Sequence, residues 1–184
     1  NALKWFAYPH AFMRSVFVSA LKGLVPKNAT PFFVLFLSQV KRNAENFIHS
    51  SKIIGNSVHV CFSIKTNPHP QILRTLAAAG VGMEAVSLRE LHQISSFSCK
   101  KIFNSPASSE AEIREALKQK CIMVIDNISQ ARLVHSISKG KFIEVGIRVR
   151  LDRHRFGFEP NEINSAIMEL QNLGLHVSLL HAHP

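Results

Sequence analysis

Short apolar runs alternate with helical patterns from about residue 30 to the end of the chain. The apolar runs are rich in β-branched and aromatic residues, whereas the segments between them repeat apolar residues every three or four positions. Strands are predicted over residues 31–36, 57–65, 82–87, 101–104, 121–126, 142–150 and 175–183. Helices are predicted over residues 38–50, 70–79, 88–95, 109–118, 129–138 and 161–173.

This regular alternation is typical of repeated βα units around a parallel sheet. From residue 57 onward there are six predicted strands, and each of the first five is followed by a helix. A closed barrel has eight such units and about 250 residues. The pattern therefore predicts an α/β fold, a partial (β/α)8 barrel of the TIM type, with a doubly wound open sheet as the alternative.

The remaining organisation is simple. Residues 1–29 are predicted to be an N-terminal extension and residues 30–184 an incomplete barrel domain. Residues 11–25 combine apolar residues with Arg14 and Lys22, which predicts an amphipathic helix and not a signal peptide. The longest apolar runs are too short to span a bilayer, so no membrane partner is expected.

The charge of the chain is strongly basic, with 22 Lys and Arg against 12 Asp and Glu and a net charge of +10. Most cations are scattered, which is typical of a solvated surface. The exception is a cluster of four arginines with no interleaved aromatic residues, so no nucleic acid partner is expected. The cluster is either a solvated strand end or an anion site; its members are Arg148, Arg150, Arg153 and Arg155.

The cysteines and glycines exclude several other classes. Cys61, Cys99 and Cys121 form no CxxC pair, so neither a disulfide framework nor a zinc ribbon is predicted, and a reducing, cytoplasmic location is the simpler interpretation. Neither GxGxxG nor GxxxxGK[ST] occurs. The sequence thus gives no support for a dinucleotide or P-loop site.

One predicted strand ends in a lysine. Over residues 57–65 the residues alternate strictly between apolar and polar, which places Lys65 on the polar face at the carboxyl end. Barrel active sites occupy that end, and a desolvated lysine amine there forms Schiff bases with carbonyl groups. The simpler interpretation is a solvent-exposed lysine. The pair Lys100 and Lys101 is predicted to be solvated surface.

The segment 62–68, Phe-Ser-Ile-Lys-Thr-Asn-Pro, resembles the lysine motif of the fold-type III pyridoxal-phosphate decarboxylases. This group contains the diaminopimelate, ornithine and arginine decarboxylases and shares its barrel with alanine racemase. Further motifs follow in the order of the family, and the diaminopimelate decarboxylase-like branch is nearest. They lie at residues 30–34, 80–87, 102–106, 145–149, 155–158 and 180–183.

The resemblance implies pyridoxal 5'-phosphate as the cofactor and gives roles to particular residues. Lys65 would hold the cofactor through a Schiff base, and His183 would lie against its pyridine ring. Arg148 would belong to the polar network near the cofactor, and Glu84 stands close to the lysine where the family usually has Asp. Arg150, where relatives often have Asn, would be an anion contact.

The implied function is decarboxylation of an amino acid such as diaminopimelate, ornithine, lysine or arginine, by a homodimer in the complete protein. The last motif breaks off at Pro184. The remaining barrel strands, the phosphate-binding loops and the C-terminal β domain of the family are absent from the sequence. We therefore expect the chain to be a fragment that is inactive alone, with a native truncation or completion by a second chain as alternatives.

Three competing functions remain. His181 and His183 share one strand face and could hold zinc together with a carboxylate, as in barrel amidohydrolases. A non-catalytic relative could keep the barrel and bind a protein partner. An amino-acid racemase would use the same barrel and lysine.

Overall fold

The computed structural model describes residues 33–55, 58–151 and 155–183. The chain divides into two compact units, Asn1–Leu35 and Phe36–Pro184, and every element described below lies in the second. The predicted helix over residues 11–25 and Arg153 lie outside the described residues.

The second unit contains a six-stranded parallel sheet whose strands follow one another in chain order. A doubly wound sheet reverses its strand order at a switch point, and this sheet has no reversal, so the barrel prediction is confirmed and the alternative is wrong. The strands are β1 Cys61–Ser63, β2 Gly82–Ala85, β3 Lys101–Phe103, β4 Ile122–Ile125, β5 Ile143–Val149 and β6 Leu175–Ala182.

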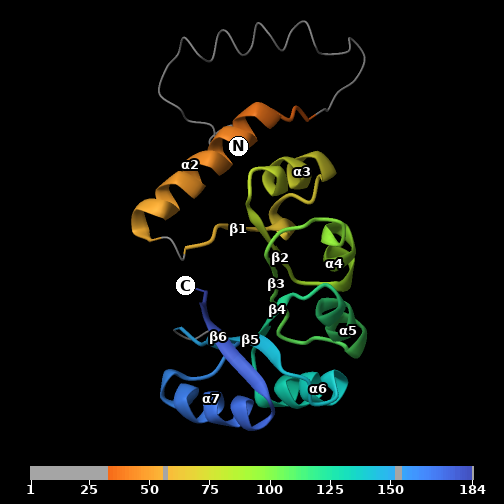
Figure 1. The fold of residues 1–184 in the computed structure, drawn as a ribbon, viewed down its shortest axis with the longest axis vertical. Helices are drawn as coiled ribbons and strands as arrows, with labels where there is room; N and C mark the ends of the chain where they lie inside the picture. The colour runs from red at the N-terminus through yellow and green to blue at the C-terminus, as the bar shows by residue number, and fades with distance from the viewer. Residues whose placement is uncertain (1–32, 56–57, 152–154, 184) are drawn as a thin grey trace, which may run out of the picture. The chain divides into compact units, whose positions relative to one another are not determined.

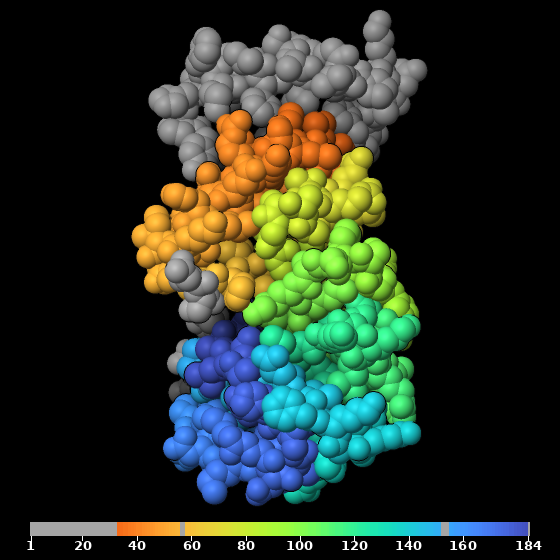
Figure 2. Space-filling model, viewed as in Figure 1, coloured from red at the N-terminus to blue at the C-terminus, as the bar shows by residue number. Residues whose placement is uncertain are grey.

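Helices connect these strands, and Figure 1 shows α3 to α6 along one face of the sheet. In the space-filling view, the units from α3 to α7 follow each other in chain order (Figure 2). No helix in the described residues is both long and apolar enough to cross a membrane. The helices are α2 Leu37–Ile54, α3 Pro70–Ala78, α4 Leu88–Ile94, α5 Glu110–Lys118, α6 Ile128–Ser138 and α7 Ile163–Asn172, with short 3-10 turns η2 Ile64–Thr66 and η3 Pro160–Glu162.

The core lies between the sheet and its helices. Met83, Phe103 and Ile147 are fully buried strand residues, and Leu91 and Ile113 are their counterparts on the helices. The junctions from strand to helix are closed by capping side chains, which accept hydrogen bonds from the exposed backbone N–H groups of the first helical turn. The capping residues are Ser87, Ser109 and Asn127.

The predicted strand over residues 31–36 is wrong in its described part. Phe33 to Phe36 form no strand, and α2 begins immediately afterwards, at Leu37. Isolated apolar segments become strands only when a partner accepts their backbone hydrogen bonds. No described strand pairs with this segment.

The strand predicted over residues 57–65 is shorter than expected. Regular pairing covers only Cys61–Ser63, and Lys65 lies in the 3-10 turn η2. Pro68 restricts Asn67 to an extended conformation, so the chain makes one tight turn between the strand and that residue. The side chain of Lys65 is exposed. Because the residue lies in a turn and not in the strand, the alternation of strand residues does not determine where its side chain points.

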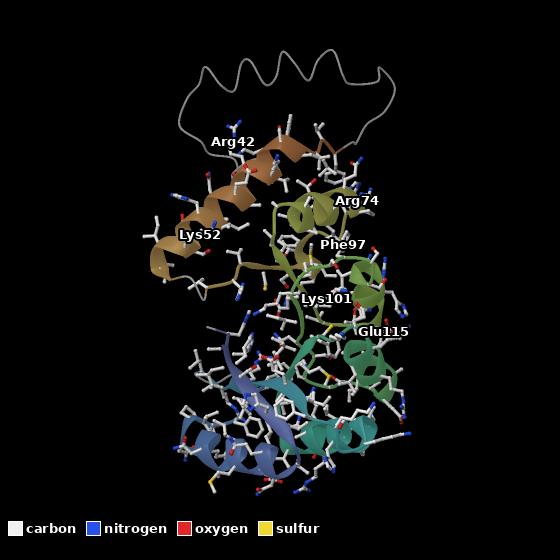
Figure 3. The ribbon with its side chains drawn as sticks, viewed as in Figure 1. Arg42, Lys52, Arg74, Phe97, Lys101 and Glu115 are labelled. Carbon is white, nitrogen blue, oxygen red and sulfur yellow. The ribbon has the colours of Figure 1, made fainter. Side chains whose placement is uncertain are left out.

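The expectation for Lys101 is also wrong. Lys100 is exposed, but Lys101 is only 8% exposed and its Nζ donates to the backbone oxygen of Ser95, 3.2 Å away (Figure 3). The residue lies at the start of β3, where its long aliphatic stem packs against the protein and one carbonyl receives its ammonium group.

Candidate functional site

Polar side chains gather at the carboxyl ends of the parallel strands. Glu84 lies near the end of β2, Asn104 follows β3, Asp126 follows β4, and Arg148 and His181 lie near the ends of β5 and β6. The carboxyl ends of parallel strands meet at one edge of the sheet, and in barrels this edge carries the active site. These five residues, called the strand-end cluster below, form the candidate site.

Asn104 connects the two sides of the strand-end cluster. Its Nδ2 lies 2.8 Å from Glu84 Oε1 and 3.2 Å from His181 Nε2. Strands β3 and β6 are not neighbours in the sheet, so this contact requires the sheet to curl towards its own concave face, as a barrel does. The amide thus closes a hydrogen-bonded chain of three side chains across the concave face.

Arg148 and Asp126 form a second contact in the cluster. Arg148 Nη1 lies 3.6 Å from Asp126 Oδ1, and the guanidinium carbon lies 5.4 Å from the centre of the Phe156 ring. Burial raises the pKa of Asp126, while the Gly157 N–H, Arg148 and Arg150 act in the opposite direction. The site therefore holds a carboxyl group that loses its proton less readily than an exposed one.

His181 is half-buried and stands beside His183. The two rings are nearly parallel, at 14°, with centroids 6.5 Å apart. Burial lowers the pKa of His181, Arg148 and His183 lower it further, and only Glu84 raises it. The imidazole is consequently disposed to stay neutral near physiological pH.

The structure brings together three of the four residues predicted for the cofactor site. Glu84 and Arg148 belong to the strand-end cluster, and His183 stacks on it through His181. Lys65 stands apart, since its amine has no hydrogen bond or ion pair among the described residues. It follows β1, whose Ser63 pairs in register with Glu84 on β2, so it belongs to the same edge of the sheet.

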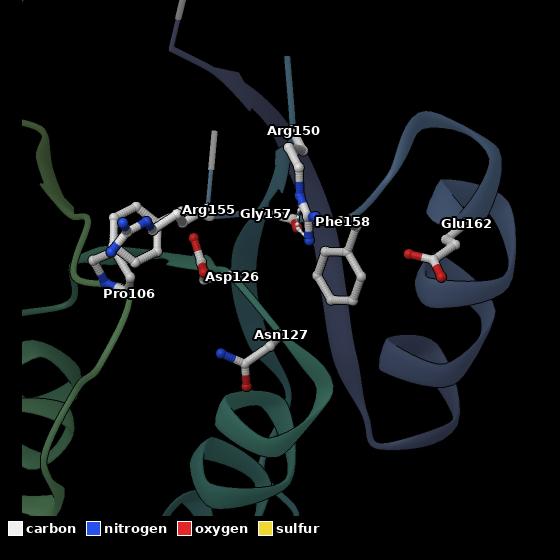
Figure 4. Close-up of a pocket in the computed structure, with 9 residues that line it drawn as sticks. Pro106, Asp126, Asn127, Arg150, Arg155, Gly157, Phe158 and Glu162 are labelled. Carbon is white, nitrogen blue, oxygen red and sulfur yellow. Dashed lines mark hydrogen bonds between the residues drawn. The ribbon is translucent and has the colours of Figure 1, made fainter. Parts of the chain in front are cut away.

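A pocket of about 370 Å³ lies beside the cluster, where β4 and β5 end. Figure 4 shows Asp126 and Asn127 at the point where β4 runs into α6, with Arg150, Phe158 and Glu162 among the other residues that line the pocket. The lining thus carries both signs of charge. This mixture fits a small polar molecule that has acidic and basic groups.

Arg150, predicted as an anion contact, already has partners within the protein. Its Nη1 lies 2.9 Å from Glu159 Oε1, and its Nη2 and Nε donate to the Gly157 oxygen at 3.0 and 3.3 Å. Arg148 is likewise paired with Asp126. At these two positions the arginines therefore bind groups of the protein itself, and Arg150 connects the end of β5 with Gly157 and Glu159.

Three buried polar atoms near the strand ends have no hydrogen-bond partner among the described residues. They are Ser63 Oγ, Asp126 Oδ1 and His181 Nδ1. Leaving a buried donor or acceptor unpaired costs about 1–3 kcal/mol. Both donors and acceptors are present at the edge of the sheet to which the lysine after β1 also belongs, and pyridoxal phosphate fits such a site because it carries ring, hydroxyl and phosphate groups and an aldehyde.

Sequence reasoning missed Asn104 and Asp126 as site residues. Each is the last residue of a predicted strand of the parallel sheet, and this position at the carboxyl end could have identified both. The zinc alternative for His181 and His183 requires a third ligand. Among the described residues there is no group of three or more His, Cys, Asp or Glu side chains placed to hold a metal ion.

Comparison with known proteins places this geometry in a family. Residues 37–181 match the pyridoxal-dependent decarboxylase family in its pyridoxal binding domain. A diaminopimelate decarboxylase from Deinococcus radiodurans is 30% identical over 137 residues, which is 67% of this chain and 36% of that protein. One from Vibrio cholerae is 31% identical over 110 residues, 56% of this chain and 26% of that protein.

Solved structures share the fold. Diaminopimelate decarboxylase from Helicobacter pylori, complexed with L-lysine, superposes with a TM-score of 0.79 at 20% identity, covering 91% of this chain and 46% of that one. Lysine decarboxylase from Selenomonas ruminantium gives 0.77 at 22% identity, covering 90% and 44%. The chain thus spans about a third of these curated relatives and less than half of the solved chains.

The resemblance found in the sequence motifs is therefore confirmed at the level of family and of fold. The match covers most of the second compact unit and includes Lys65, Glu84 and Arg148. The chain belongs to the pyridoxal-dependent decarboxylase family, whose pyridoxal binding domain residues 37–181 match.

Proposed function

We propose that the chain is the cofactor-binding part of an enzyme that decarboxylates an amino acid with a basic or amino-terminated side chain. The observation that carries the proposal is the position of Lys65, an exposed amine without a protein partner, directly after β1 at the edge of the sheet where the strand-end cluster gathers. The family match supports the cofactor, and the names of the curated relatives support the reaction.

In this proposal four residues of the chain hold the cofactor, each through a different group. Lys65 would hold it covalently, His183 would lie against its ring, and Glu84 and Arg148 would contact its polar groups. Pyridoxal phosphate, when bound, supplies an electron sink for the electron pair left by the departing carboxyl group. Arg148 and Asp126 keep the polar site charged yet largely dry, which strengthens electrostatic interactions inside it.

Diaminopimelate is the substrate we propose first, with ornithine, lysine and arginine as the others. The curated relatives are named for diaminopimelate, and the mixed charge of the pocket beside Asp126 fits a molecule with ammonium and carboxylate groups at both ends. We also propose residues 30–184 as the barrel domain and residues 1–29 as an extension. The start of the family match at residue 37 supports this division.

We further propose a cytoplasmic homodimer. The three cysteines, Cys61, Cys99 and Cys121, are all free, as is usual in a reducing compartment. Light scattering of the purified complete protein tests the dimer.

Reduction with borohydride tests the lysine. The complete protein is incubated with pyridoxal phosphate, reduced, digested and mapped by mass spectrometry. We expect the cofactor on the peptide that contains Lys65, and no label in Lys65→Ala. Lys100→Ala is the matched control, since Lys100 is also exposed but lies before β3, and it should be labelled as the wild type is. A label on another lysine would refute the assignment.

The reaction is tested separately by release of CO₂ from diaminopimelate, ornithine, lysine and arginine. Release from at least one supports the proposal. A labelled protein that releases no CO₂ but interconverts enantiomers would be a racemase. A protein that binds no cofactor would be a non-catalytic relative.

A further inference from the structure

The contacts of Asn104 determine which nitrogen of His181 carries a proton. The amide nitrogen has two hydrogens and two neighbours within hydrogen-bond distance, Glu84 Oε1 at 2.8 Å and His181 Nε2 at 3.2 Å. An amide nitrogen donates and does not accept. Nε2 of His181 must therefore accept, and it carries no proton.

Glu84 fixes the orientation of this amide. If the amide turned over, Asn104 Oδ1 would face the Glu84 carboxylate, and an ionised carboxylate also only accepts. The two oxygens would repel each other, so the orientation with Nδ2 towards Glu84 is the favourable one. The carboxylate on β2 thus acts on the histidine on β6 through the side chain that follows β3.

The proton of the neutral imidazole then lies on Nδ1. This atom is buried and has no hydrogen-bond partner among the described residues. The charged form of His181 is opposed by its surroundings, because burial, Arg148 and His183 all lower its pKa and only Glu84 acts the other way. A buried N–H group without a partner is a site for an acceptor atom of a ligand.

We infer that Asn104, oriented by Glu84, is a positioning residue that holds His181 neutral with its proton on Nδ1, and that this N–H donates a hydrogen bond to an anionic oxygen of the bound ligand. The tautomer follows from the protein alone, whereas the identity of the ligand rests on the proposed function. The oxygen belongs either to the cofactor or to the carboxylate of the amino-acid substrate, which share this chemistry.

Nitrogen NMR of ¹⁵N-histidine-labelled protein tests the tautomer without ligand. The His181 signals are assigned by their loss in His181→Gln. We expect Nε2 with the shift of an unprotonated nitrogen and Nδ1 with that of a protonated one near neutral pH. A proton on Nε2 would overturn the inference, and the wild-type spectrum decides this without any variant of Asn104.

Variants then test the role of Asn104. In Asn104→Asp the new carboxylate can only accept, so the proton of His181 should move to Nε2. Asn172→Asp is the matched control, since it introduces the same charge at an exposed position at the end of α7 and should leave the tautomer unchanged. An unchanged His181 in Asn104→Asp, with a folded spectrum, would show that the amide does not position it.

Two ligands, added one after the other, test whether the Nδ1 N–H of His181 donates a hydrogen bond. Pyridoxal phosphate is added first and L-lysine afterwards, and the His183 signals report binding. A shift of Nδ1 with the first addition assigns the oxygen to the cofactor, and a shift only with the second assigns it to the amino acid. If His183 responds while Nδ1 of His181 does not, the donor role is refuted. If neither responds, the donor role and the proposed function fail together, and the tautomer result stands by itself.

Discussion

Arg148 and Asp126 form an ion pair in which neither charge has much contact with water. Their side chains are 12% and 7% exposed, and Nη1 lies 3.6 Å from Oδ1. Arginine keeps its charge under all ordinary conditions, so removing the carboxylate leaves a buried cation with no counterion. Removing one partner of this pair therefore lowers the free energy of unfolding much more than removing one partner of an exposed pair.

We expect Asp126→Ala to lower the free energy of unfolding by about 3 kcal/mol, the usual cost of breaking a buried pair. The control is Glu169→Ala, which breaks the Arg132–Glu169 pair at 2.8 Å, with side chains 67% and 41% exposed; it should cost less than about 1 kcal/mol. Urea unfolding measures both. Equal losses would show that the Arg148–Asp126 pair is effectively solvated.

Gly157 has a positive φ of 96°, and a Cβ there would lie 2.8 Å from the Arg148 oxygen and 3.0 Å from the Arg150 nitrogen. Gly157→Ala should therefore lower the free energy of unfolding for two reasons. Holding alanine in the left-handed conformation costs about 1–2 kcal/mol, and the steric overlap of its Cβ costs about 1–3 kcal/mol more. Gly174→Ala, with φ of 73° and open space around it, should cost only the first amount. Thermal unfolding compares the two; the prediction is wrong if Gly174→Ala is the more damaging change.

His181 should make stability depend on pH. Its pKa is lower in the folded chain than its ordinary value, because of burial, Arg148 and His183. The unfolded chain therefore binds the proton first as the pH falls, and the folded state loses stability below about pH 6.5. We expect His181→Gln to reduce the drop in melting temperature between about pH 8 and about pH 5.5.

The control for this measurement is His49→Gln, an exposed position on α2. It should leave the drop in melting temperature as large as in the wild type. If the melting temperature drops equally in His181→Gln and His49→Gln, folding does not lower the pKa of His181, and the prediction is wrong.

Two lysines occupy backbone conformations that favour glycine. Lys120 and Lys139 have φ of 56° and 55° after the ends of α5 and α6. Replacing either by glycine should raise the free energy of unfolding by about 0.5–1 kcal/mol, because glycine adopts this conformation without steric cost. Lys118→Gly, at the last residue of α5, should instead lower it, by at most about 1 kcal/mol, the cost of glycine in a helix interior. Chemical denaturation distinguishes the three, and a loss in Lys120→Gly would contradict the prediction.

Much of the fold was predictable from local pattern. Ser109 is followed by Glu110 and Glu112, a sequence typical of a helix start, and the structure has a capping box between Ser109 and Glu112. All six strands of the sheet lie within their predicted ranges. Pairing is a property of two segments, however, and for that reason the pattern did not show that Phe33 to Phe36 form no strand or that regular pairing ends at Ser63.

The candidate site was predictable only in part. Motifs pointed to Lys65, Glu84, Arg148 and His183, but no motif indicated that Glu84 accepts a hydrogen bond from Asn104. That bond and the contact of Asn104 with His181, 77 residues further along the chain, depend on how strongly the sheet curls. Curvature arises from the whole sheet, and no short segment encodes it.

The strand order allows the sheet to form while the chain is being synthesised. Every strand from β2 to β6 pairs with the strand that precedes it in the sequence, and paired residues such as Cys61 and Gly82 are separated by only about 20 residues, a span that closes at small entropic cost. During translation, each new strand therefore leaves the ribosome when its partner is already available. The sheet can grow in one direction, from β1 to β6, and no strand has to wait for a later one.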